Sequence, residues 1–220
     1  MSKVYAAPVI GTTSSKHSER GVVKTWLING ASSGIGRRIA IEALDRGDDV
    51  IALGSTADEI VEAVGAGPHL AAYGVDVTDA CAAADAVAAG VARFGCIDVV
   101  VNDVAQPDSG AEDSTAIFGR QLLGPVNVIE AVVPLLTAQG SGRIVNVTQT
   151  AWGTDVDGCA VCASARAGLT EYGKHRAADL RSTGVSVVTV ESPSVPLGFL
   201  DGSMRLVKIG PVATYRAVPV

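Results

Sequence analysis

Charged residues are scarce in this sequence of 220 residues: they make up 18% of it, against 48% hydrophobic residues. A chain this apolar is not expected to be disordered outside its ends. The net charge is -6, so the basic surface of a nucleic-acid-binding protein is missing. An unbroken apolar run of about 18 residues is missing too, so we expect no membrane-spanning helix and no membrane partner.

Residues 1–20 lack the apolar centre of a signal peptide and are rich in serine, threonine, lysine and glycine. We expect a flexible lead-in there. One domain should follow over residues 21–220, because a chain of this length can bury a substantial single core.

Cysteine is sparse as well: the four cysteines do not form a disulfide-rich pattern. We therefore expect reduced thiols and a cytoplasmic protein. Cys159 and Cys162 form a lone Cys-x-x-Cys, without a second pair or nearby histidines. No metal site is expected from it, and a redox pair stays open as an alternative.

A glycine-rich turn, Asn29–Gly36, is the main feature that is present. It lies between an apolar run, Trp26–Ile28, and a helical pattern of apolar residues. Strand, glycine turn and helix in this order are typical of a dinucleotide site. We expect Gly30 to permit the tight turn, Gly34 to let backbone approach a pyrophosphate, and Gly36 to let helix pack on strand. The helix N-terminus would supply N–H groups for the phosphates.

Strand and helix patterns alternate along the rest of the chain. This alternation predicts an α/β fold: a single doubly wound parallel sheet, Rossmann-like, with helices on both faces and ligands beyond the carboxyl ends of the strands. The C-terminal segment after Pro193 is short, and it contains two candidate strands. The expected strands are Val22–Asn29, Val50–Leu53, Leu70–Val75, Ile97–Val101, Ile144–Val147, Val185–Val190, Met204–Ile209 and Thr214–Val220, and the expected helices are Gly34–Arg46, Ala57–Val64, Asp79–Phe94, Glu112–Ala138 and Cys162–Leu180.

The glycine turn resembles the Thr-Gly-x-x-x-Gly-x-Gly loop of the short-chain dehydrogenase/reductase (SDR) family, with Asn29 in place of the threonine. Asn102–Ala105 is similar to the family's Asn-Asn-Ala-Gly segment, and Gln121–Pro125 to its Asn-x-x-Gly-Pro segment. Gly142–Gln149 resembles its serine-bearing strand, and Cys162–Leu169 its Tyr-x-x-x-Lys-Ala-Gly-Leu helix. The resemblance implies a nicotinamide cofactor, carbonyl–alcohol chemistry, and a homodimer or homotetramer paired through helices 112–138 and 162–180.

The resemblance also implies that the family's catalytic Asn, Ser, Tyr and Lys are all replaced, by Gln121, Gln149, Cys162 and Arg166 in that order. Arg166 can still hold a ribose or an anion, because it is permanently charged. Cys162 is either a proton donor or nucleophile with a lowered pKa, or a small packed thiol.

Two loop carboxylates, Asp103 and Asp155, are further acid/base candidates if burial raises their pKa values. The alternative is that both are solvated loop carboxylates. The candidate catalytic residues are therefore Gln149, Cys162, Arg166, Asp103, Asp155 and Gln121.

The cofactor preference follows from the end of the second strand. Leu53–Thr56 contains no carboxylate to repel a 2′-phosphate, and Arg37 lies just inside the first helix, so NADP(H) is favoured over NAD(H). Asp76 and Val77 match the family's adenine-contacting pair, although Asp76 or Thr78 could instead cap the next helix. The candidate cofactor-binding residues are Gly30, Ser32, Ser33, Gly34, Ile35, Gly36, Ser55, Asp76, Val77, Asn102 and Arg166.

Three functions fit these observations. The first is an atypical, NADP(H)-binding carbonyl reductase of small-molecule biosynthesis that lacks the Tyr-Lys pair. The second is a non-redox enzyme on the same fold, such as a cyclase, isomerase or dehydratase, with no cofactor. The third is a catalytically silent subunit that stabilises an active partner. The two enzymatic hypotheses both imply a small-molecule substrate, whose structure the sequence does not reveal.

Overall fold

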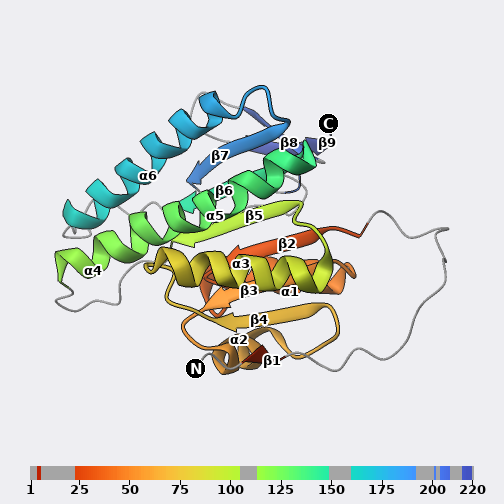
Figure 1. The fold of residues 1–220 in the computed structure, drawn as a ribbon. Helices are drawn as coiled ribbons and strands as arrows, with labels where there is room; N and C mark the ends of the chain where they lie inside the picture. Colours follow the sequence, from red (N-terminus) through yellow and green to blue (C-terminus); the bar gives the residue numbers. More distant parts are fainter. Residues whose placement is uncertain are drawn as a thin grey trace.

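The computed structural model describes residues 4–5, 23–104, 113–148, 160–191, 201, 204–208 and 215–219. Within these residues the main sheet has seven strands in the order β1-β4-β3-β2-β5-β6-β7 (Figure 1). All neighbouring pairs are parallel except β1 with β4. The strands are β1 (Val4–Tyr5), β2 (Thr25–Asn29), β3 (Asp49–Gly54), β4 (Leu70–Gly74), β5 (Val99–Val104), β6 (Gly142–Thr148) and β7 (Val185–Glu191).

The strand order reverses between β2 and β5, which lie side by side at the centre of the sheet. In an open parallel sheet this switch point leaves a crevice at the carboxyl ends of the strands, where ligands bind. The predicted doubly wound parallel sheet is confirmed. The pairing of Val4 and Tyr5 with β4 was not predicted, since that stretch was expected to be a flexible lead-in.

Two helical layers cover the sheet. One face, built on Trp26, Ile28 and Val101, packs against α1 and α2, and the other, built on Leu27, Val100 and Ile144, packs against α3, α5 and α6 (Figure 1). Alternate residues of one strand thus enter opposite cores, as expected for a strand buried on both faces. The helices are α1 (Gly34–Asp45), α2 (Ala57–Val64), α3 (Ala80–Phe94), α5 (Gly124–Gln139) and α6 (Ala160–Asp179).

The helix predicted over Glu112–Ala138 is wrong in one respect: it is not uniform. It begins as α4 (Ser114–Phe118), widens into a π-helical turn η1 (Gly119–Leu123) and continues as α5. By length and composition alone, Ser114–Gln139 could cross a membrane. Its residues Val128, Ile129 and Leu136 are fully buried against the sheet, so we interpret it as a core helix.

The two strands predicted near the C-terminus are confirmed as an antiparallel pair, β8 (Met204–Lys208) and β9 (Tyr215–Pro219). Asp201, which lies between β7 and β8, contacts residues at the amino-terminal edge of the main sheet. Its carboxylate is 3.4 Å from Lys24 Nζ and 3.1 Å from an Arg46 guanidinium nitrogen. The chain at Asp201 is therefore at the edge opposite to the crevice.

Candidate functional site

The glycine turn has the geometry that its sequence predicts. Gly30 and Gly34 have φ values of +90° and +59°, a region that favours glycine. The N–H groups of Gly30 and Ala31 both donate to the Leu53 carbonyl, at 3.0 and 3.2 Å, which fixes the turn to β3. A Cβ atom on Gly36 would collide with the Gly30 carbonyl oxygen. The first and third glycines therefore serve the predicted tight turn and close packing.

Helix α1 begins at this turn, where its first N–H groups need a partner from outside the helix. Ser33 is its N-cap, but the Ser33 side chain makes no capping hydrogen bond, and the first turn has no acidic residue. Uncapped N–H groups and the helix dipole together favour an anion at this position. Ser33 and Gly34 are exposed, Ser32 is half-buried, and Ile35 and Gly36 are buried.

A carboxylate from β5 reaches this helix end. Asp103 Oδ2 accepts a hydrogen bond of 2.6 Å from the Gly36 N–H, and the Asp103 side chain is in the interior, with the residue only 7% exposed. Its Oδ1 atom has no hydrogen-bond partner among the described residues. Burial raises the pKa of Asp103 to about 6, although the N–H groups of Gly36 and Ile35 act in the opposite direction. Of the two alternatives for Asp103, the structure therefore agrees with a buried carboxyl of raised pKa and not with a solvated loop carboxylate.

Asn102, the residue before Asp103, belongs to a row of amides that crosses three strands. Its Oδ1 accepts from Asn29 Nδ2 at 3.2 Å, and its Nδ2 donates to Asn146 Oδ1 at 3.0 Å. Asn102 and Asn146 are fully buried. This row joins β2, β5 and β6 across the switch point, so Asn102 has a structural role in the sheet.

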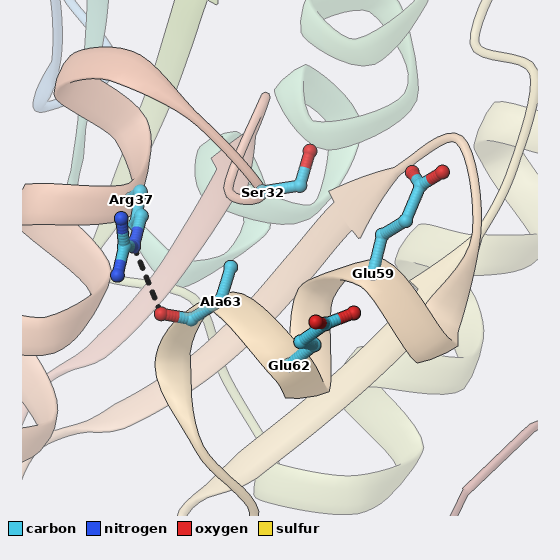
Figure 2. Close-up of a pocket in the computed structure, with 5 residues that line it drawn as sticks. All are labelled: Ser32, Arg37, Glu59, Glu62 and Ala63. Atoms are coloured by element: carbon cyan, nitrogen blue, oxygen red, sulfur yellow. Dashed lines mark hydrogen bonds between the residues drawn. The ribbon is translucent and has the colours of Figure 1, made fainter.

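The adenosine side of the expected site contains an open pocket of about 430 Å³. It is lined by Ser32, Arg37, Glu59, Glu62 and Ala63. Figure 2 shows Arg37 turned towards the main chain of α2, where its Nε donates to the Ala63 carbonyl at 2.9 Å. The predicted contact Ser55 is exposed beside this region. Both signs of charge therefore line the pocket. The sequence had indicated Ser32 and Arg37 as cofactor-side residues, but neither glutamate.

Asp76 forms a local turn and does not cap a helix. Its Oδ1 accepts from the Thr78 N–H at 2.9 Å and from the Thr78 hydroxyl at 2.7 Å, and these bonds lower its pKa. The cap of α3 is Asp79, which accepts from Cys81 and Ala82, so the capping alternative for Asp76 or Thr78 is wrong. Asp76 is exposed, and the Val77 carbonyl accepts from Asn127, so the turn is fixed against α5.

Three of the predicted catalytic residues lie on adjacent elements. Gln121 is 3% exposed inside η1, and α6, which carries Cys162 and Arg166, packs on η1. Arg166 is half-buried, and Cys162 is buried and disulfide-bonded, contrary to the expected reduced thiol. A disulfide sulfur carries no proton, so the proposed role of Cys162 as proton donor or nucleophile requires its reduced form. Gln149 and Asp155 lie outside the described residues.

These features define a Rossmann-like dinucleotide-binding fold with its glycine turn at the switch point. A family model described as short chain dehydrogenase matches residues 24–199, and the chain belongs to this family.

The relatives agree with that family. Oxidoreductase BOA17 of Botryotinia fuckeliana is 29% identical over 193 residues, which cover 84% of this chain and 70% of that protein. A 2-(R)-hydroxypropyl-CoM dehydrogenase of Xanthobacter autotrophicus is 31% identical, over 72% of this chain and 69% of its own. A short-chain dehydrogenase structure from Streptomyces avermitilis superposes with a TM-score of 0.69 and 28% identity, covering 81% of this chain and 69% of that one.

A 3-ketoacyl-(acyl-carrier-protein) reductase from Brucella melitensis, solved with NADH, superposes with a TM-score of 0.68. It is 23% identical and covers 76% of this chain and 74% of its own, so it supports the shared fold. Members of the family bind nicotinamide cofactors, and the residues of the glycine turn and the α1 N-terminus fit such a group here.

Proposed function

We propose that this protein binds a nicotinamide dinucleotide at the β2–β5 switch point and is an atypical, NADP(H)-dependent carbonyl reductase acting on a small molecule in the cytoplasm. The observation that carries the proposal is the glycine turn, whose positive φ values and tight packing leave the α1 N–H groups at the crevice. The similar proteins named as oxidoreductases or reductases support the same class of reaction.

The residues that bind the cofactor and assist the reaction would differ from the family's usual tyrosine and lysine. The cofactor supplies the hydride. Arg166 would donate hydrogen bonds from its guanidinium to the ribose hydroxyls. Gln121 would donate a hydrogen bond near the substrate, since an amide is a donor but no useful acid near neutral pH. The proton for the carbonyl oxygen would come from water or from the substrate itself.

A titration with NADPH and NADH, read by nicotinamide fluorescence, tests the proposal. We expect micromolar binding, weakened more than about tenfold by Gly36→Ala or Gly36→Val, because any Cβ at position 36 meets the Gly30 carbonyl. Gly67→Ala is the matched control, since a Cβ there meets nothing within 4 Å. Circular dichroism shows which variants are folded. Absence of binding at millimolar nucleotide would contradict the proposal.

The preference for NADP(H) rests on Arg37 and on the absence of a carboxylate from Leu53–Thr56, and the two glutamates in the same pocket oppose it. Arg37 would attract a 2′-phosphate there, whereas Glu59 and Glu62 would repel it and favour a free ribose diol. We expect Arg37→Gln to weaken NADPH binding more than NADH binding, and Glu59→Gln to do the reverse. NADH binding more tightly than NADPH in the unaltered protein would contradict the preference.

The replaced catalytic positions also favour a second candidate, a non-redox enzyme such as a cyclase, isomerase or dehydratase. The disulfide at Cys162 adds to this, because it leaves no proton donor at the position of the family's tyrosine. This candidate, like the silent-subunit hypothesis, predicts no turnover of nicotinamide with any carbonyl compound. A homodimer or homotetramer through helices 112–138 and 162–180 is a proposal for the two enzymatic candidates, whereas a silent subunit would pair with a different, active chain.

A further inference from the structure

The buried carboxylate of Asp103 lies where the negative phosphates of a dinucleotide would be attracted. Oδ2 accepts from the Gly36 N–H at 2.6 Å, and a Cβ on Gly36 would be 3.2 Å from the Asp103 Cβ, so side chain and helix end are in direct contact. This N–H belongs to the first turn of α1, whose donors have no partner within the helix and can therefore bind an anion. The protein thus carries its own anion at that helix end.

We propose that Asp103 is a positioning residue that makes binding of the dinucleotide pyrophosphate proton-coupled: the ligand's negative charge and the ionised carboxylate exclude each other, so binding takes a proton up onto Asp103. The inference rests on the proposed nucleotide binding. It assigns Asp103 a role towards the ligand phosphates through α1, and no direct part in the chemistry.

The environment of Asp103 supports this coupling. The residue is 7% exposed, Oδ1 lacks a hydrogen-bond partner among the described residues, and burial already brings its pKa to about 6. A second negative charge nearby disfavours the ionised form further. The bound pyrophosphate would therefore raise the pKa of Asp103 further. As a result, ligand binding between about pH 6 and 8 would be accompanied by protonation of Asp103.

Neighbouring charged groups do not supply this effect. Strand β2 has no ionisable side chain, and on β6 Arg143 pairs with Val99, four residues from Asp103. On α1, Arg37 bonds to the Ala63 carbonyl on α2. No charged side chain in the described part of the chain contributes to the pKa shift of Asp103. The charged residues on these elements are Arg37, Arg38, Glu42, Asp45 and Arg143.

The test is calorimetric titration with NAD⁺ or ADP-ribose between about pH 5.5 and 8.5, in pairs of buffers that differ in ionisation enthalpy. These ligands are chosen because their pyrophosphate does not titrate in that range, unlike the 2′-phosphate of NADP. We expect affinity to fall as pH rises above about 6, with net proton uptake. Asp103→Asn keeps an oxygen acceptor for the Gly36 N–H but removes the charge. The affinity of this variant for the ligand should not depend on pH, and binding should take up no proton. At pH 8 the variant should bind the ligand at least about tenfold more tightly than the unaltered protein does.

Asp98→Asn is the matched control. Asp98 precedes the same strand and accepts from the Thr25 N–H at 2.8 Å, at the opposite edge of the sheet. Its variant should keep the pH dependence of the unaltered protein. If the ligand binds and Asp103→Asn has the same pH profile as the unaltered protein, the inference is overturned while the proposed function stands. If no variant binds the ligand at any pH, both are overturned.

Discussion

Asp103 is a buried carboxyl group in contact with the N-terminus of α1. Its pKa is raised by burial from 3.8 to about 6, so the unfolded chain releases this proton at lower pH than the folded protein does. The contribution of protonated Asp103 to the free energy of unfolding is fully present below about pH 4, and it is lost as the pH rises through about 6. Ionised Asp103 therefore destabilises the folded state at neutral pH, the opposite of the usual surface carboxylate.

We accordingly expect Asp103→Asn to raise the free energy of unfolding of the ligand-free protein by about 3 kcal/mol above pH 7, and by roughly half as much at pH 5. Urea unfolding of both proteins at the two pH values measures the difference. Asp98→Asn, as the control, should show no such gain at pH 8. An Asp103→Asn variant that is less stable than the unaltered protein at pH 8 would mean that the Gly36 hydrogen bond outweighs the burial of charge.

The sequence predicts single residues well where the reason is local. Gly30 and Gly36 were predictable because a tight turn and a close helix contact each require a missing Cβ within a few residues. The contact between Asp103 and Gly36 was not, since 67 residues separate them and it exists only because β5 pairs beside β2. Asp103 was identified as an acid/base candidate, but its orientation towards α1 follows from the sheet topology.

At the scale of elements, close packing of helix on strand depends on glycine. A Cβ on Gly90 of α3 would be 2.6 Å from Ile51 Cγ2 on β3, with a second Ile51 carbon at 2.7 Å. Both residues lie in the core, and Ile51 is fully buried. An added methyl group therefore cannot enter without displacing α3 or the isoleucine.

We predict that Gly90→Ala lowers the free energy of unfolding by about 1 to 3 kcal/mol, despite the better helix propensity of alanine. Thermal or urea unfolding measures this loss. The double variant Gly90→Ala with Ile51→Val, which shortens the opposing side chain, should recover part of it. A Gly90→Ala protein as stable as the unaltered one would show that α3 is less tightly packed than described.

Element types were predictable from periodicity, and most boundaries agree within two residues, as α2 shows. The π-helical turn η1 was not predictable. It lies where Gly119 and Gly124 approach Thr78 and Val77, so its backbone depends on contacts with a distant turn. π-Helical turns are frequent at functional sites, and this one contains Gln121. The local sequence therefore predicts a helix here, but the position of its π-helical turn depends on tertiary packing.

At the scale of the whole molecule, the two edges of the sheet have different roles. The carboxyl edge carries the glycine turn and Asp103, while at the amino edge ionic contacts hold Asp201 to Lys24 and Arg46. The Asp201 side chain is only 1% exposed. The chain at Asp201 is thus fixed to the edge away from the crevice.

Asp201→Asn should destabilise the protein by about 1 to 3 kcal/mol, because it leaves cations beside a buried site without their partner charge. It should leave nucleotide affinity unchanged, since the change is at the far edge. Asp179→Asn is the control. The Asp179 carboxylate is 65% exposed and 3.8 Å from Arg176, so its replacement should change the free energy of unfolding by no more than about 0.5 kcal/mol. Weaker nucleotide binding by the Asp201 variant would show that the two edges are coupled.

In the proposed function, the N-terminus of α1 receives the dinucleotide phosphates. Amide chemical shifts of ¹⁵N-labelled protein during titration with NADH test it most directly, because each backbone N–H reports separately. We predict the largest changes at Gly34, Ile35 and Gly36, with none at Gly67. Saturating nucleotide that leaves the three α1 amides unchanged would contradict the account, whatever its effect elsewhere in the protein.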